Sequence, residues 1–195
     1  MTDLTRASHE LFRRSPDERF GSLSELSEYC QQERQFSNDR WQLPQSLAPR
    51  VSDRVVTVDL KGDDAPFYLN DWSFTQLCRF NRVSKETLNR LAPETASQAL
   101  GETLPSGEKP IQLLATGKTV RSLHGVAYTR LWNAELVKTV QEFATNFRPA
   151  PAGCDRQTGL YCGEQDLFAF LIDPTGWAEI NGEAFAPGFF VWNSE

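Results

Sequence analysis

Residues 110–129, PIQLLATGKTVRSLHGVAYT, decide the fold class of this 195-residue chain. Residues 110–116 are short and largely apolar, as a buried strand is, and Gly117-Lys118 is a two-residue turn signal. Residues 119–129 then return as the partner strand. The stretch therefore predicts an antiparallel hairpin at the centre of the chain.

Regular alternation along the returning strand predicts which side chains share a face. One face is expected to carry Val120, Ser122, His124 and Val126. The other is expected to carry Arg121, Leu123 and Gly125. Gly125 is a candidate bulge, because glycine inside a strand often marks one, and a bulge there would bring Tyr128 to the side of Arg121.

Further strands and helices are expected on both sides of the hairpin. Strands are expected at residues 54–59, 67–69, 166–172, 177–180 and 189–192. Helices are expected at residues 22–35, 73–80, 93–100 and 133–147, with another starting after Ser84. This pattern predicts an α+β fold with a mixed or antiparallel sheet, packed helices and a C-terminal β-meander. Residues 1–50 are expected to form a polar, partly helical N-terminal extension, and residues 51–195 a single domain.

Caps and turns fix several of these boundaries. Capping boxes are expected at Ser22–Glu25 and Ser73–Gln76, and N-caps at Ser84 and Asn133. Residues 173–176 have the composition of a type I turn, which would pair residues 177–180 back onto residues 166–172. Asn181-Gly182 predicts a second hairpin turn.

Charge and composition limit the classes of protein to which this chain can belong. The chain has a net charge of −6, which argues against a strongly basic nucleic-acid coat. Residues 77–140 are the cationic part, with 9 basic and 5 acidic side chains. No stretch is long and apolar enough to span a membrane, and the N-terminus lacks the apolar core of a secretory signal. The sequence therefore predicts a cytoplasmic protein with no membrane partner. The four cysteines form no CxxC pair, so no metal is expected.

Three stretches resemble the phage- and plasmid-like proteins of domain-of-unknown-function family 932. They are residues 74–93, the motifs between Val120 and Leu136, and residues 166–173 with the final Gly188-Phe-Phe-Val-Trp-Asn-Ser-Glu195. The resemblance covers about residues 66–195. It implies a mobile-element setting and no established activity, so no catalytic residue follows from it. Family members continue past the Asn-Ser-Glu motif, whereas this sequence stops there.

A helix-turn-helix pattern over residues 75–91 is one candidate site. Exposed polar residues after Ser84 are of the types that contact phosphates and base edges. Arg82 stands where such turns favour glycine and a positive φ. A plain helical hairpin packed on a sheet is the alternative, and short motifs often match by chance.

A second cluster lies around the returning strand and includes Arg121, His124, Tyr128, Arg130, Asn133 and Glu135. Arginine with tyrosine and asparagine suits phosphate or carboxylate capture, and a histidine near a glutamate can do acid–base chemistry. The alternative is structural, because the start of a helix explains Asn133 and Glu135. Carboxylates at Asp166, Asp173, Glu179, Glu183 and Glu195 are a third group, with nothing to fix their geometry as a metal site.

The sequence favours a non-enzymatic, nucleic-acid-associated protein with no cofactor, which binds DNA through its cationic centre. The residues expected to bind are Arg79, Arg82, Lys85, Asn89, Arg90, Arg121, Tyr128 and Arg130. Two alternatives stay open. One is an enzyme or ligand-binding domain with a pocket around Arg121 and Tyr128. The other is a protein-interaction module that forms oligomers through its exposed C-terminal strand.

Overall fold

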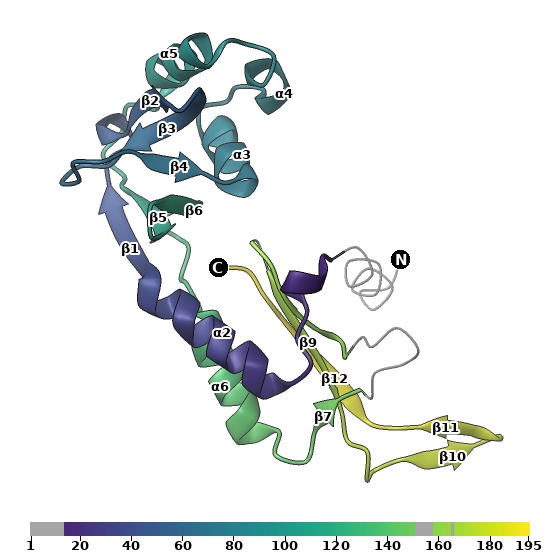
Figure 1. Cartoon of the computed structure of the whole chain (residues 1–195). Helices are drawn as coiled ribbons and strands as arrows, with labels where there is room; N and C mark the ends of the chain where they lie inside the picture. Colours follow the sequence, from purple (N-terminus) through teal and green to yellow (C-terminus); the bar gives the residue numbers. More distant parts are fainter. Residues whose placement is uncertain (1–13, 151–157, 165) are drawn as a thin grey trace. The chain divides into compact units, whose positions relative to one another are not determined.

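The computed structural model describes residues 14–150, 158–164 and 166–195 and divides the chain into two compact units (Figure 1). The central unit is Phe36–Arg130. The terminal unit combines the residues up to Gln35 with Leu131–Glu195. A mixed six-stranded sheet, antiparallel sheets and packed helices confirm the α+β class.

The central unit is one sheet with helices against it. Its strands are β1 (Ser37–Gln42), β2 (Ala48–Ser52), β3 (Val55–Asp59), β4 (Phe67–Leu69), β5 (Ile111–Thr116) and β6 (Thr119–Gly125). Their order in the sheet is β1-β5-β6-β4-β3-β2, and only the β4–β6 pair is parallel. Its helices are α3 (Asp71–Phe80), α4 (Lys85–Leu88) and α5 (Pro93–Thr103), with a 3₁₀ turn η2 (Pro44–Ser46). The expected hairpin around Gly117 is confirmed, and Gly117 has a positive φ of 56°.

One face of this sheet forms the hydrophobic core. Leu113 of β5 and Val120 of β6 are fully buried there against Leu77 of α3 and Leu100 of α5. Phe67 and Val58 are opposite each other on β4 and β3 and extend the same core. Because burial of such side chains contributes about 1.5–3 kcal/mol each, this face holds the helices on the sheet.

A β-bulge in β6 changes the alternation predicted from the sequence. Val120 is opposite Ala115, but Ser122 is opposite Leu114, so Arg121 is the extra residue. After it, Leu123 faces the core while Ser122 and His124 face the other side. The expected grouping of Val120 with Ser122 and His124 is therefore wrong, and the bulge is at Arg121 rather than Gly125. An extra residue inverts every later side chain of a strand.

Among the caps predicted at serine residues, one is corrected and two are confirmed. Asn70, not Ser73, caps α3, because its Oδ1 accepts the Ser73 backbone N–H at 2.8 Å. Gln76 then serves another purpose, since its Oε1 accepts the Leu123 N–H of β6 at 2.9 Å. The caps at Ser84 and Ser22 are confirmed by hydrogen bonds from the Thr87 N–H and from the Glu25 N–H, each at 3.2 Å.

The terminal unit packs two helices on one face of a second sheet. The helices are α2 (Leu23–Phe36), which continues one residue into the central unit, and α6 (Asn133–Phe143), after a 3₁₀ turn η1 (Pro16–Glu18). The strands are β7 (Arg148–Pro149), β8 (Leu160–Cys162), β9 (Leu167–Ile172), β10 (Ala178–Ile180), β11 (Glu183–Phe185) and β12 (Gly188–Asn193). Leu26, Val137 and Val140 of the helices are buried against Leu167 and Leu171 of β9. β9 is the centre of the sheet, since β7, β8 and β12 all pair with it.

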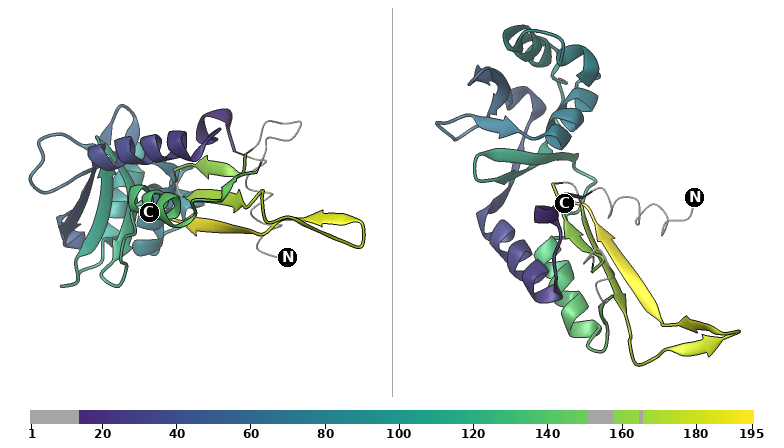
Figure 2. Two further views of the ribbon diagram at one scale, coloured as in Figure 1. Left: turned by 90° about the horizontal axis from the view of Figure 1, so that it is seen from below. Right: turned by 45° about the vertical axis from the view of Figure 1, so that its right-hand side comes forward.

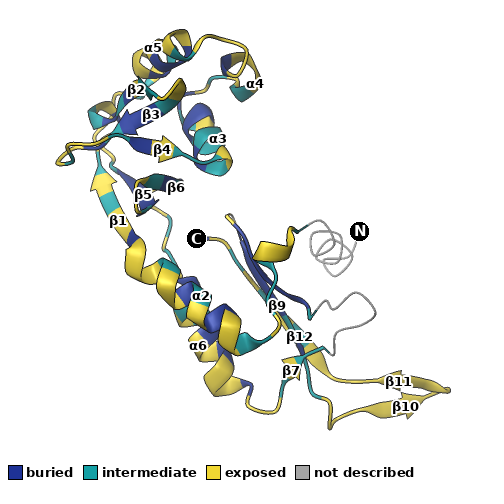
Figure 3. Ribbon diagram, viewed as in Figure 1, coloured by how far each residue is buried: buried dark blue, intermediate teal, exposed yellow. Residues whose placement is uncertain are grey.

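The C-terminal meander is confirmed, but its pairing differs from the expectation. β10 pairs with β11 across the Asn181-Gly182 turn, where both residues have positive φ, and not with β9. β12 pairs with β9 instead. β10 and β11 therefore form a two-stranded ribbon that extends beyond β9 and β12 (Figure 2), and every residue of the ribbon is exposed (Figure 3). Thr175 donates to Asp173 and lowers the pKa of that carboxyl, which closes the turn before the ribbon.

Asn133 is the first residue inside α6 and not its cap. Its backbone N–H donates to the Glu195 carboxylate, which takes the place of a capping side chain. Asn193 donates to the Asn133 side-chain oxygen at 2.8 Å and to the Leu131 carbonyl at 2.7 Å. The Asn-Ser-Glu motif therefore fastens β12 to the start of α6.

The expected boundary at residue 50 does not coincide with the division into units. Residues 37–42 and 48–52 are strands of the central sheet, and α2 contributes the fully buried Leu26 to the terminal core. We expected an extension because residues 1–50 are mostly polar. β1 and β2 are the outer strands of the central sheet, however, and such strands need an apolar residue only at every second position.

No helix among the described residues has the length and apolar character needed to cross a membrane.

We predict that Gly188→Ala destabilises the terminal unit. A β-carbon there would lie 2.9 Å from the Leu171 carbonyl oxygen and 3.2 Å from Ile172 Cγ2, so β12 would have to move from β9. Such overpacking costs about 1–3 kcal/mol in urea-unfolding free energy. Gly101→Ala, in α5 with nothing within 4 Å of the new carbon, is the control and should stabilise by about 0.5–1 kcal/mol. Equal unfolding curves for Gly188→Ala and wild type would contradict the packing.

Candidate functional site

The face of the central sheet away from the helices is polar and partly aromatic. Register places Trp41 of β1 opposite Gln112 of β5, and Gln112 opposite His124 of β6. These three residues form one row across the sheet, with neighbouring strands about 4.8 Å apart. We call this the polar face. Trp41 is 51% exposed, a large fraction for a large aromatic side chain.

The segment after β6 adds two of the predicted residues to this face. The Tyr128 ring stacks on the His124 ring, with centroids 3.7 Å apart and planes 12° from parallel. Arg130 Nε donates to Asp39 Oδ1 at 2.8 Å, and Asp39 is opposite Leu114 in the next row of the same face. The Arg130 guanidinium carbon lies 5.5 Å from the centre of the Tyr128 ring. Arg130 therefore holds the Tyr128 segment on the sheet.

Some buried polar groups on this face lack a hydrogen-bond partner among the described residues. They include Gln112 Oε1, Ser122 Oγ and Thr57 Oγ1, in residues that are 6%, 0% and 0% exposed. Native proteins pair most buried polar atoms, so each unpaired one calls for an explanation such as a bound group. Gln112 lies in the aromatic row itself, between Trp41 and His124.

The other predicted residues belong to the helix layer. Arg79, Arg82, Asn89 and Arg90 are exposed on α3, α4 and the turns that follow them. Arg82 has a positive φ of 57°, the conformation that its position in the turn requires. Lys85 is bound to Asp71 Oδ1 at 2.6 Å and to Thr75 Oγ1 at 2.8 Å, so it joins α4 to the start of α3.

The predicted residues thus fall into two groups on opposite sides of the sheet. Tyr128 and Arg130 lie with the polar face, whereas Arg79, Arg82, Lys85, Asn89 and Arg90 lie in the helix layer. Arg121, at the bulge, is half-buried. Lys85 and Arg130 are neutralised by Asp71 and Asp39. A shared positive patch of all these cations is therefore not formed.

The helix pair α3–α4 lacks the dimensions of a DNA-reading motif. α4 has four residues, little more than one helical turn, whereas a recognition helix lies along the major groove and presents several side chains to it. Leu88 of α4 is buried in the central core. α3 and α4 instead form a plain helical hairpin packed on a sheet, which was the alternative to the helix-turn-helix motif.

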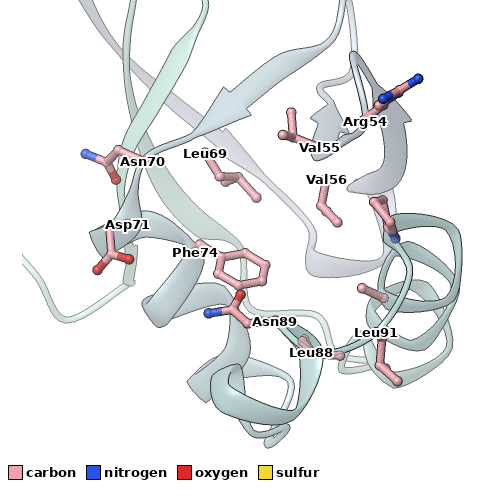
Figure 4. A pocket seen from close by; sticks show the side chains of 12 residues that line it. Arg54, Val55, Val56, Leu69, Asn70, Asp71, Phe74, Leu88, Asn89 and Leu91 are labelled. Carbon is pink, nitrogen blue, oxygen red and sulfur yellow. The ribbon is translucent and has the colours of Figure 1, made fainter.

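A pocket of about 370 Å³ lies between β3, β4 and the helices (Figure 4). Phe74, Leu69 and Leu88 line it, and Arg54 stands at its rim. Of its polar residues, Asn70 already caps α3 and Asp71 already binds Lys85. Neither Arg121 nor Tyr128 lines this pocket, so it is not the ligand pocket that the sequence predicted around those two residues.

Of the five candidate carboxylates, Asp166, Asp173 and Glu195 have structural partners, whereas Glu179 and Glu183 are exposed on the ribbon. Asp166 binds Arg14 at 2.7 Å, Glu195 accepts the Asn133 N–H, and Asp173 accepts from Thr175. Among residues 14–150, 158–164 and 166–195, no three metal-ligating side chains come together. Cys30, Cys78 and Cys162 are buried thiols, and burial raises the pKa of Cys78. Cys154 lies outside the described residues.

Sequence reasoning missed Trp41, Asp39 and Gln112. Trp41 and Asp39 were assigned to the N-terminal extension, and Gln112 was read as part of an apolar strand. A glutamine between Ile111 and Leu113 was a usable signal, because a buried amide in a strand needs a partner. Nothing local to residues 37–42 showed that they would lie beside β5.

Comparisons of the chain with protein-family models, with curated proteins and with solved structures each find no match. The residues and their geometry therefore carry the functional argument.

We predict that Asp39→Asn destabilises the central unit more than an ordinary surface change. The Arg130 side chain is 2% exposed, so the variant removes the Asp39 carboxylate from a buried guanidinium. We expect a loss of about 1–3 kcal/mol in urea-unfolding free energy. Asp59→Asn breaks the exposed pair with Arg50 and should cost less than about 0.5 kcal/mol. Equal losses for the two variants would show that the Arg130 pair has no special role.

Proposed function

We propose that the central unit binds single-stranded nucleic acid through its polar face. The observation that carries the proposal is the row of Trp41, Gln112 and His124, with Tyr128 stacked on His124. Single-strand binding proteins present aromatic rings on which bases stack, and they favour sheet surfaces for this purpose. Each base that stacks on such a ring contributes about 1–3 kcal/mol.

Gln112 gives the row a means to contact a base edge. A carboxamide both donates and accepts, and it can form two hydrogen bonds with an adenine edge. Its Oε1 is buried without a partner, while the neighbouring Trp41 ring is open to solvent. A base stacked on Trp41 can offer the exocyclic amine that this oxygen lacks.

Arg130 and Asp39 support the face rather than bind phosphate. Their ion pair fixes the segment that carries Tyr128. The charge of the two units agrees with nucleic-acid binding by the central one, which has 12 basic and 10 acidic side chains against 8 and 16 in the terminal unit. Because the net charge of the central unit is only +2, the unit neutralises few phosphates when it binds. Its affinity should therefore depend only weakly on salt concentration.

Single strands suit this face better than duplex DNA. Bases in a duplex are already stacked, and a protein reads them by placing an element in a groove. The short α4 is poorly suited to that role. The resemblance to a mobile-element family, and the cytoplasmic location expected from the sequence, are compatible with such a ligand.

We predict that Trp41→Ala and Tyr128→Ala each weaken binding of a fluorescent single-stranded oligodeoxyadenosine about 5- to 150-fold in polarisation titrations at about 50 mM salt. Tyr128→Phe should keep most of the affinity because the ring remains. Trp177→Ala removes an exposed tryptophan of the terminal unit and should bind like wild type. No binding by the wild-type protein at this salt concentration would exclude the proposal, because electrostatic attraction is strongest there.

A second comparison separates the two faces of the central unit. The triple variant Arg79→Ala/Arg82→Ala/Arg90→Ala removes exposed cations of the helix layer. We expect a change of less than about tenfold, through long-range charge alone. If instead this variant abolishes binding and Trp41→Ala does not, nucleic acid binds the helix layer and not the polar face.

A further inference from the structure

A second row of polar side chains crosses the polar face of the central sheet. Register places Thr116 of β5 opposite Thr119 of β6, and Thr119 beside Tyr68 of β4. Tyr68 is opposite Thr57 of β3, and Thr57 is opposite Arg50 of β2. We call this line of residues the hydroxyl row. Threonine, tyrosine and arginine side chains are among the types that contact the backbone of a nucleic acid.

Alternation along β4 and β3 puts the hydroxyl row on the polar face. Phe67 is buried in the helix-covered core and Leu69 packs against that core, so Tyr68 between them is directed to the other face. The same argument holds for Thr57, because its neighbour Val58 is buried in the core. Tyr68 is 37% exposed, so part of its ring is open to solvent.

The Tyr68 ring is held in position by the turn between β2 and β3. Its hydroxyl donates to Asp53 Oδ2 at 2.5 Å. Asp53 lies four residues before Thr57 in the sequence, so the bond directs the ring along β3. A ring fixed in this way loses little conformational freedom when a base stacks on it. Because the Asp53 carboxylate repels phosphate, a base suits this ring better than a phosphate does.

Arg50 and Thr57 offer a place for a phosphate beside that ring. Arg50 Nε lies 3.4 Å from Asp59 Oδ2, and the two side chains are 66% and 43% exposed, so this is a weak surface pair. The Thr57 hydroxyl is buried without a hydrogen-bond partner among the described residues. Arg50 and Thr57 are opposite each other, with β-carbons about 5 Å apart. A phosphate that draws Arg50 away from Asp59 can therefore also accept the Thr57 hydroxyl.

The hydroxyl row and the aromatic row of Trp41 are far enough apart to contact different nucleotides. Trp41 of β1 and Tyr68 of β4 are separated by three strand spacings, and the two rows by four residues along β5. These separations place the two rings about 20 Å apart. A single strand stretched to about twice the 3.4 Å rise of duplex DNA needs about four nucleotides to reach from one ring to the other.

We propose that Tyr68 is a second base-stacking residue of the polar face and that Arg50 contacts a phosphate beside it, so that a bound single strand crosses the sheet from β1 to β2. This path rests on the nucleic-acid binding proposed for the polar face, and it adds a length and a course to that site. A span of this length agrees with the sites of about 4–16 nucleotides that sheet-based single-strand binders occupy.

Oligomer length tests whether the two rings bind one strand. Polarisation titrations at about 50 mM salt compare fluorescent oligodeoxyadenosines of about three and about ten nucleotides. Tyr68→Ala should weaken binding of the longer strand about 5- to 150-fold and change binding of the shorter one less than about twofold. If Trp41→Ala weakens binding of the longer strand but Tyr68→Ala does not, the second stacking residue is excluded and the proposed function stands. No binding by the wild type would overturn both.

Two further substitutions separate stacking from a loss of folding. Tyr68→Leu keeps an apolar side chain on β4 but removes the ring, so it should bind the longer strand as weakly as Tyr68→Ala. Tyr68→Phe keeps the ring and should stay within about threefold of wild type. Circular dichroism checks that each variant is folded. A folded Tyr68→Leu protein that binds as tightly as Tyr68→Phe would show that no base stacks on this ring.

Salt dependence tests the phosphate contact of Arg50. Each phosphate neutralised in a single strand contributes about 0.7 to the slope of log affinity against log salt concentration. Arg50→Gln should reduce the slope for the longer strand by about this amount. Arg90→Gln removes the same charge from the helix layer and should leave the slope as in wild type. Equal slopes for Arg50→Gln and Arg90→Gln would overturn the Arg50 contact.

Discussion

The β-bulge at Arg121 is the feature on which the candidate site depends. β6 enters the sheet with Val120 in the core and leaves it with Leu123 in the core, and only an extra residue between them makes both placements compatible. Because the bulge inverts the later side chains, His124 lies on the polar face beside Gln112. Tyr128 can then stack on His124, and Arg130 can reach Asp39. In a regular strand His124 would be directed into the helix-covered core, and this arrangement would be lost.

The two units differ in how they use their sheets. In the central unit the face away from the helices carries polar and aromatic side chains, several of them satisfied by ion pairs and stacking. In the terminal unit the corresponding face is aromatic, around Phe168, and the outer strand β12 carries no charge. The network of Asn133, Asn193 and Glu195 holds β12 in place at the start of α6. Charge follows the same division, since the terminal unit contains most of the excess of acidic side chains.

Local signals in the sequence predicted most of the helices, strands and turns correctly. The turn at Gly117, the cap at Ser84 and the hairpin at Asn181-Gly182 all depend on residues within a few positions of one another, and each is confirmed. Apart from the cap expected at Ser73, which Asn70 provides, the errors concern contacts between residues that are distant in the sequence. The Asn181-Gly182 turn pairs β10 with β11, whereas we expected the turn at Asp173 to pair residues 177–180 with β9. Asn133 is not a cap, because Glu195, far along the chain, accepts the hydrogen bond at the start of α6. Only part of the polar face was predicted from the sequence. Tyr128 and Arg130 were identified, but Trp41 was missed because its position beside β5 has no signature in its own segment.

The most direct test of the account observes the polar face while ligand binds. In ¹H–¹⁵N spectra of the protein, the indole N–H signals of the five tryptophans report on separate sites. Titration with a short single-stranded oligodeoxyadenosine should shift or broaden the Trp41 signal first and leave the Trp177 signal in place. A titration that moves the Trp177 signal, or that leaves Trp41 unchanged while binding saturates, would contradict the claim that this face receives the bases.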